Sequence, residues 1–150
     1  MFPLSRIVCL TEETVETLCL LEEQDRIARI SGCVVRPPQA RREKPRVSAF
    51  TSANIEKILS LQPDLVLTFS DLQAAIVADL IRRGIGVHAF NQRTVTGILE
   101  VIRMLGAMVD TSERVGELVE TLAARLADAR SVPNVYRGGR GYSSRSGTIR

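Results

Sequence analysis

The chain has 150 residues, of which 45% are hydrophobic and only 4% aromatic, and it contains no Trp. This composition predicts one globular unit with a core of Leu, Ile, Val and Ala, and it excludes a wholly disordered chain. The formal charge is +3, but residues 1–136 carry 16 basic and 17 acidic side chains, so the excess of positive charge lies in the C-terminal stretch. That distribution argues against nucleic-acid binding.

Residues 7–30 predict a strand, a helix and a second strand. The apolar run at 7–10 is typical of a short strand, and a helix begins after Thr11, because Glu12 and Glu13 supply the negative charge that a helix N-terminus favours. The buried side of this helix is formed by Val15, Leu18 and Cys19. The second apolar run, at 26–30, ends at Ser31 and Gly32.

Residues 31–50 carry three prolines and show no sustained period, so they predict a long irregular connection. A helix at 53–61 follows, and then the run LVLTF at 65–69, whose unbroken apolar character is typical of a strand buried on both faces of a parallel sheet. The pattern repeats with a helix at 72–83, a strand at 87–90 and a helix at 94–108. Four strands alternating with helices predict an α/β fold, a three-layer, Rossmann-like lobe around a four-stranded parallel sheet.

The last predicted helix spans residues 112–130, with Asp110 or Thr111 as its cap and an apolar stripe from Val115 to Leu126. The stripe is compatible with a helix that folds back on the lobe and with one that reaches another body. After Pro133 the sequence is rich in Gly, Ser and Arg, which predicts disorder. We therefore expect a lobe at 5–110, a long helix at 111–131 and a tail at 132–150.

Ligands of open parallel sheets bind outside the carboxyl ends of the strands. Polar and aromatic residues follow the predicted strands at these ends, and we expect them to line a binding site. The candidates are Thr11, Glu12, Phe69, Ser70, Asp71, Asn91, Gln92 and Arg93. Phe50, at the end of the long connection, is a further candidate, although its spacing is equally compatible with a core position.

Catalytic and metal-binding patterns are not apparent in the sequence. The single histidine, His88, falls inside a predicted strand, where a packed core residue is the simpler interpretation. The first strand is followed by CLTEETVE instead of a glycine-rich dinucleotide motif, and Cys9, Cys19 and Cys33 lack CxxC spacing. We predict a protein that is not an enzyme and holds no resident cofactor or metal.

Three segments resemble one protein family. They are RIVCLTEETVETL, the stretch from RPPQARREKPRVSAF through NIEKILSLQPDLVLTFS, and GIGVHAFNQRTVTGILEVIRMLGAMVD. Over about residues 5–130 the chain resembles the first lobe of substrate-binding proteins of ABC importers for cobalamin and ferric siderophores, and the cobalamin-binding branch looks most similar. The resemblance implies two α/β lobes joined by one long backbone helix, with the ligand between the lobes.

The resemblance also implies roles for individual residues. Phe50 corresponds to an aromatic position that packs on the ligand, a corrinoid or a metal chelate such as a siderophore or haem. The loops at Thr11–Glu12, 69–71 and 91–93 would line the same cleft. Glu56 corresponds to an exposed acid that docks on the membrane permease of the ABC transporter. The family implies a periplasmic or cell-surface protein that does not span the membrane, whereas the sequence as written shows no signal peptide and reads as cytoplasmic.

The C-terminal stretch departs from this family. An intact member continues into a second lobe, whereas this chain continues with PNVY and an Arg/Gly/Ser-rich tail. We hypothesise a truncated or frameshifted chain with half of a binding cleft. An alternative is a cytoplasmic α/β ligand-sensing or regulatory module whose tail is genuine.

Overall fold

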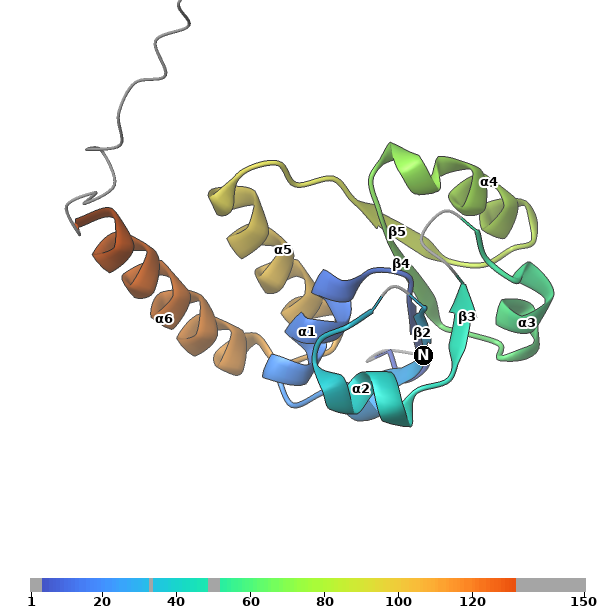
Figure 1. Ribbon diagram of the computed structural model, residues 1–150, viewed down its shortest axis with the longest axis horizontal. Coiled ribbons are helices and arrows are strands. Elements are labelled where there is room, and N and C mark those ends of the chain that lie inside the picture. The colour runs from blue at the N-terminus through green and yellow to red at the C-terminus, as the bar shows by residue number, and fades with distance from the viewer. Residues whose placement is uncertain (1–3, 33, 49–51, 132–150) are drawn as a thin grey trace, which may run out of the picture.

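Five parallel strands form the centre of the protein in the computed structural model, which describes residues 4–32, 34–48 and 52–131. The strand order is β3-β2-β1-β4-β5, with helices on both faces of the sheet (Figure 1). The strands are Ile7–Cys9 (β1), Ile27–Ser31 (β2), Arg46–Ser48 (β3), Leu65–Phe69 (β4) and Val87–Phe90 (β5). The three-layer α/β lobe is thus confirmed, whereas the expected number of four strands is wrong.

The additional strand, β3, lies in the segment that the sequence suggested was irregular. It pairs with β2 at the edge of the sheet, and its three residues are too few to show a period of two. Val47 is buried, and its carbonyl accepts a hydrogen bond from the Asn54 amide at 2.9 Å. The same segment holds a short helix, Pro38–Glu43 (α2), which has proline in its first turn, where a missing amide hydrogen costs nothing.

The remaining helices follow the predicted order. They are Glu12–Leu20 (α1), Ile55–Ser60 (α3), Ala74–Arg82 (α4), Val95–Met108 (α5) and Ser112–Ser131 (α6), with 3₁₀ turns at Gln24–Arg26 (η1) and Asp71–Gln73 (η2). Side-chain oxygens cap two of them, since Asn54 accepts from the Lys57 amide and Thr94 from the Gly97 amide, both at 3.0 Å. Thr11 stands at the N-cap of α1, but its hydroxyl does not cap that helix.

The side chains of β1 and of Leu10, the residue that follows it, alternate between two separate cores. Ile7 and Cys9 pack with residues of α1 and α5 on one face of the sheet. Val8 and Leu10 pack with residues of α3 and α4 on the other. All four side chains are completely buried, as expected for the central strand of a parallel sheet. Both faces are therefore closed to ligands around this strand.

Helix α6 folds back on the lobe at its N-terminal end and then projects away from the sheet (Figure 1). Thr111, and not Asp110, begins it, since the Val115 amide donates to the Thr111 carbonyl at 3.0 Å. Val115 and Val119 are buried with Ile102 of α5 and with the residue that follows α1, Leu21. The apolar stripe is thus covered in its first half by the lobe itself.

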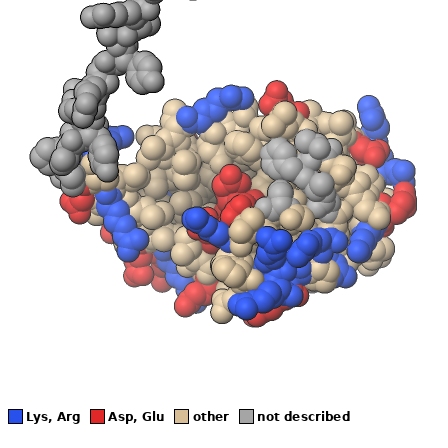
Figure 2. Space-filling model, viewed as in Figure 1, with Lys and Arg blue, Asp and Glu red and all other residues tan. Residues whose placement is uncertain are grey.

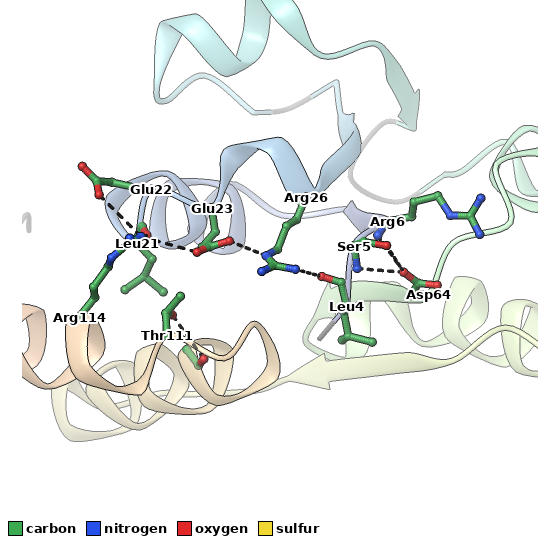
Figure 3. A network of polar contacts seen from close by, with 11 residues as sticks. Leu4, Ser5, Arg6, Leu21, Glu22, Glu23, Arg26, Asp64, Thr111 and Arg114 are labelled. Atoms are coloured by element: carbon green, nitrogen blue, oxygen red, sulfur yellow. Dashed lines mark hydrogen bonds and ion pairs between the residues drawn. The ribbon is translucent and has the colours of Figure 1, made fainter. Parts of the chain in front are cut away.

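Polar contacts link the start of α6 to the turn after α1 (Figure 3). Arg114 donates from Nη1 to the Leu21 carbonyl at 3.0 Å and lies 3.6 Å from carboxylate oxygens of Glu22 and Glu23. Glu23 also pairs with Arg26, which donates to the Leu4 carbonyl at 2.7 Å. The chain of contacts joins α6, η1 and the residues before β1.

Asp64 makes a second link, between the starts of β1 and β4 (Figure 3). Its Oδ2 accepts from the amides of Ser5 and Arg6, both at 2.9 Å, and from the Ser5 hydroxyl at 3.1 Å. The Ser5 amide, followed by the Arg6 amide, holds the pKa of the Asp64 carboxyl below its ordinary value. The ionised form of Asp64 is therefore the one that favours the folded state.

Replacement of Gly106 tests the close contact between α5 and α6. A Cβ at this position would lie 1.7 Å from Cγ2 of Val115, so Gly106→Ala should force the helices apart and lower the free energy of unfolding by about 1–3 kcal/mol. Gly116→Ala is a matched control, because Gly116 lies in α6 with open space around it and alanine favours a helix by about 0.5–1 kcal/mol. Chemical denaturation of both variants measures the difference, and equal effects would contradict the contact.

The Asp64 link predicts a pH dependence of stability. Because the carboxyl has a lower pKa in the folded than in the unfolded chain, its contribution is present above the unfolded value of 3.8 and is lost as pH falls through the folded value. Thermal unfolding should show a fall in Tm between about pH 5 and pH 2 that is shallower in Asp64→Asn than in the parent. The exposed Asp25 provides a control, and an Asp25→Asn variant that flattened the profile equally would argue against the link.

Candidate functional site

The carboxyl ends of β4 and β5 lie side by side. Phe69 and Phe90 are register partners, and the Ser70 amide donates to the Phe90 carbonyl at 2.8 Å, so the two loops leave the sheet together. Ser70 has a φ of 61°, a left-handed conformation that is uncommon outside glycine and that turns the chain sharply away from β4. The structure thus brings residues 69–71 and 91–93 to one edge of the sheet, as the sequence predicted.

A hollow of about 370 Å³ opens at this edge, between α1 and α5. Three of the expected site residues line it, namely Phe69, Gln92 and Arg93. Its other walls are Glu13 and Thr17 from α1 and Thr94, Val95, Ile98, Val101 and Ile102 from the start of α5. An apolar concavity with a few polar groups at its rim is the usual form of a small-molecule site.

The Gln92 side chain stands out in this hollow. Its Oε1 atom is buried and has no hydrogen-bond partner among the described residues. A buried carbonyl oxygen without a donor is unfavourable by about 1–3 kcal/mol, so a donor from a ligand or an ordered water would stabilise it. Arg93 is exposed and donates from Nη2 to Asn91 Oδ1 at 3.4 Å.

The other expected strand-end residues line a different hollow. Ser70, Asp71 and Asn91 border a depression of about 450 Å³ on the α4 side of the edge, together with apolar residues of α4 and β5. Phe69 and Asn91 therefore belong to neighbouring hollows rather than to one. This division follows from the alternation of side chains along β4 and β5, which sends successive residues to opposite faces of the sheet.

The residues after β1 are engaged within the lobe. Thr11 is only 2% exposed, and its hydroxyl lies 3.0 Å from that of Thr14. Glu12 accepts from the Arg36 amide at 2.9 Å through Oε1, which fastens the connection after β2 to the start of α1. Both residues thus help to hold the edge, and Glu12 remains half-buried beside it. Phe50 lies outside the described residues, as does Cys33.

Gln73 joins β1 to β4 and was not indicated by the sequence analysis. Its side chain is completely buried, with Oε1 accepting from the Phe69 amide at 2.9 Å and Nε2 donating to the Leu10 carbonyl at 3.1 Å. These are the residues at which β4 ends and the chain leaves β1, which is the point where the strand order reverses. The sequence contained no sign that Gln73 is buried, because glutamine is usually exposed and Gln73 directly precedes an amphipathic helix.

Among the described residues, no cysteine or histidine lines either of the two hollows. Burial raises the pKa of the Cys9 thiol to about 12, and burial likewise raises that of Cys19. His88 is half-buried on the edge strand β5, its ring 4.4 Å from that of Phe90. Within residues 4–32, 34–48 and 52–131, no three side chains of His, Cys, Asp or Glu are grouped so that they could hold a metal ion.

A doubly wound parallel sheet with hollows at its carboxyl edge is the architecture of an α/β ligand-binding lobe. A family model described as "Periplasmic binding protein" matches residues 7–133. The chain belongs to this family. None of the helices in the described part of the chain is long and apolar enough to cross a bilayer.

The chain is similar to proteins described as binding vitamin B12 or heme. The vitamin B12-binding protein of Vibrio cholerae serotype O1 is 28% identical over 131 residues, which are 87% of this chain and 47% of that protein. The crystal structure of the periplasmic vitamin B12 binding protein of Vibrio cholerae has a TM-score of 0.77 and 26% identity, over 85% of this chain and 50% of the other. A periplasmic heme binding protein from Pseudomonas aeruginosa has the same fold, with a TM-score of 0.76 and 18% identity over 85% of this chain and 46% of that one. The chain spans about half the length of the curated relatives it matches.

Removal of the Gln73 side chain tests its role at the edge. Gln73→Ala would leave the Phe69 amide and the Leu10 carbonyl without a partner, so the free energy of unfolding should fall by about 2 kcal/mol or more. Gln39 is exposed on α2, and Gln39→Ala should change it by less than about 0.5 kcal/mol. Urea denaturation compares the two, and a neutral Gln73→Ala would show that the bridge contributes nothing.

Proposed function

We propose that this lobe forms one wall of a cleft that binds cobalamin or a related metal chelate, such as a ferric siderophore or haem. The proposal rests chiefly on the 370 Å³ hollow at the carboxyl edge, in a chain 28% identical to a vitamin B12-binding protein. The family and these named relatives support binding rather than catalysis. In this role the protein would be the solute-binding component of an ABC importer.

The lining of the hollow suits a bulky ligand with an apolar body and polar substituents. Phe69, Val95 and Ile98 offer apolar contact surface, and Ile98 is 48% exposed although it is an aliphatic side chain. The exposed Arg93 stands at the rim, where a carboxylate of a ligand would pair with it. The Gln92 oxygen is buried deeper and would accept from an amide that entered the hollow. Ser70, Asp71 and Asn91 extend the same edge toward α4.

The permease of the importer would be the second partner. Glu56, the residue expected to dock on it, has a side chain that is 75% exposed and lies 3.0 Å from Arg83 Nη1. An exposed ion pair of this kind contributes only about 0–1 kcal/mol, so Glu56 can exchange Arg83 for a cationic partner at little cost. A binding protein that serves a permease in this way would act in the periplasm or at the cell surface.

The lobe alone should bind its ligand weakly. A ligand held between two lobes loses a large part of its contact surface when only one is present, while the entropic cost of association remains. We therefore expect a Kd for cobalamin or haem on the order of micromolar or weaker for this chain. Submicromolar affinity in calorimetry would show that one wall is sufficient.

Ligand-induced NMR shifts locate the site directly. Titration with cobalamin, and separately with haem, should shift the amides of Thr17, Phe69 and Gln92. Ile98→Glu should weaken binding about tenfold or more, because it replaces apolar contact with a charge that the ligand would desolvate. Shifts confined to other surfaces would contradict the proposed site.

The matched control lies on the same helix. Met104 is 44% exposed on α5 but does not line the hollow, so Met104→Glu should leave the affinity unchanged. If both variants lost the same affinity, any negative charge on α5 would weaken binding, and the loss in Ile98→Glu would not show that Ile98 contacts the ligand.

A further inference from the structure

Basic side chains concentrate in one surface segment of the lobe. Residues 36–46 carry five of them, against the single acid Glu43, whereas the rest of residues 1–136 carries 11 basic and 16 acidic side chains. The segment is therefore net positive and the remainder net negative. Figure 2 shows Lys and Arg gathered over α2 and β3. We call the five residues the basic surface: Arg36, Arg41, Arg42, Lys44 and Arg46.

The charges of the basic surface are not used within the lobe. The ion pairs among the described residues involve Arg26, Arg83 and Arg114, all of which lie elsewhere. Four members of the basic surface are exposed, and Lys44 is half-buried. Like charges this close repel one another, so an external anion would stabilise the surface.

Protection of the sheet edge accounts for only part of this pattern. Strand β3 is an edge strand, and a short strand flanked by proline and a positive charge resists pairing with other chains. Pro45 and Arg46 meet that need. Arg41 and Arg42 lie in the last turn of α2, where the helix dipole favours positive charge, but their exposed side chains form no ion pair among the described residues.

We propose that the basic surface binds an anionic phospholipid bilayer. Lipid headgroups are mobile and adapt to an exposed array of positive charges, whereas the centre of a protein interface usually contains aromatic anchors. Single-stranded nucleic acid would need aromatic side chains for base stacking, and the described residues 34–48 include none. Val35, 52% exposed beside Arg36, is an apolar side chain able to enter the interfacial layer.

This inference does not depend on the ligand of the hollow. The basic surface lies over α2 and β3, and none of its five residues lines the hollow between α1 and α5, although the Arg36 amide donates to Glu12 beside the hollow residue Glu13. Bilayer binding through these five residues does not use the residues that line the hollow.

Vesicle co-sedimentation of the whole chain tests the proposal. The protein should bind vesicles of phosphatidylcholine with about a quarter phosphatidylglycerol and not vesicles of phosphatidylcholine alone, and binding should be lost at about 0.5 M salt. The triple variant Arg41→Glu, Arg42→Glu and Arg46→Glu should bind at least about tenfold more weakly, since each basic side chain near the surface strengthens binding about fivefold. Thermal unfolding should be little changed, because all three side chains are exposed.

The control reverses three exposed arginines elsewhere. Arg82→Glu, Arg103→Glu and Arg125→Glu change the net charge equally and leave the C-terminal arginines in place. This variant should keep most of the vesicle affinity. Absence of vesicle binding, or equal losses in the two triple variants, would overturn the proposal. It would also be overturned if the basic surface bound single-stranded DNA and not vesicles.

Discussion

Complete burial of the central strand is the constraint on which the lobe depends. Ile7, Val8, Cys9 and Leu10 are inaccessible to solvent, two on each face, so the helices must cover both sides of β1. This leaves the strand ends as the places where irregular backbone and polar side chains meet solvent. At the carboxyl ends the covering helices α1 and α5 also begin, and the gap between their first turns becomes the hollow.

A buried amide maintains that edge. Strands β1 and β4 are neighbours in the sheet but are separated by more than fifty residues in the chain, and their ends diverge into different loops. Gln73 satisfies one backbone group from each and so fixes the distance between the loops. Asp64 performs the corresponding task at the amino end, where its carboxylate binds the residues before β1. Gln73 carries an amide that does not titrate, so its contribution is independent of pH. Asp64 carries a carboxyl, so its contribution depends on pH.

The sequence predicted those features that depend on uninterrupted patterns. The runs at 65–69 and 87–90 coincide with β4 and β5. The apolar run of β4 is typical of a strand inside a parallel sheet, whereas β5 is an edge strand in which only Phe90 is buried. Strand β3 could not be recognised, since Arg46–Ser48 contributes a single buried apolar side chain between polar neighbours. The edge position of residues 69–71 and 91–93 follows from strand direction alone. Their division between two hollows depends both on the alternation of side chains along β4 and β5 and on where α1, α4 and α5 pack around the edge. The role of Gln73 depends on a contact between distant segments, so local pattern alone predicted neither feature.

The basic surface and the hollow are formed by different residues of the lobe. None of the five basic residues lines the hollow, although the Arg36 amide donates to Glu12, next to the hollow residue Glu13. The α5–α6 contact at Gly106 and Val115 ties α6 to the helix whose first turn lines the hollow. Ile102 of α5 lines the hollow and also packs with Val115 and Val119 of α6, so the two helices share buried apolar contacts beside the hollow. The start of α6 is thus packed on the helix that lines the hollow, and not on the basic surface of α2 and β3.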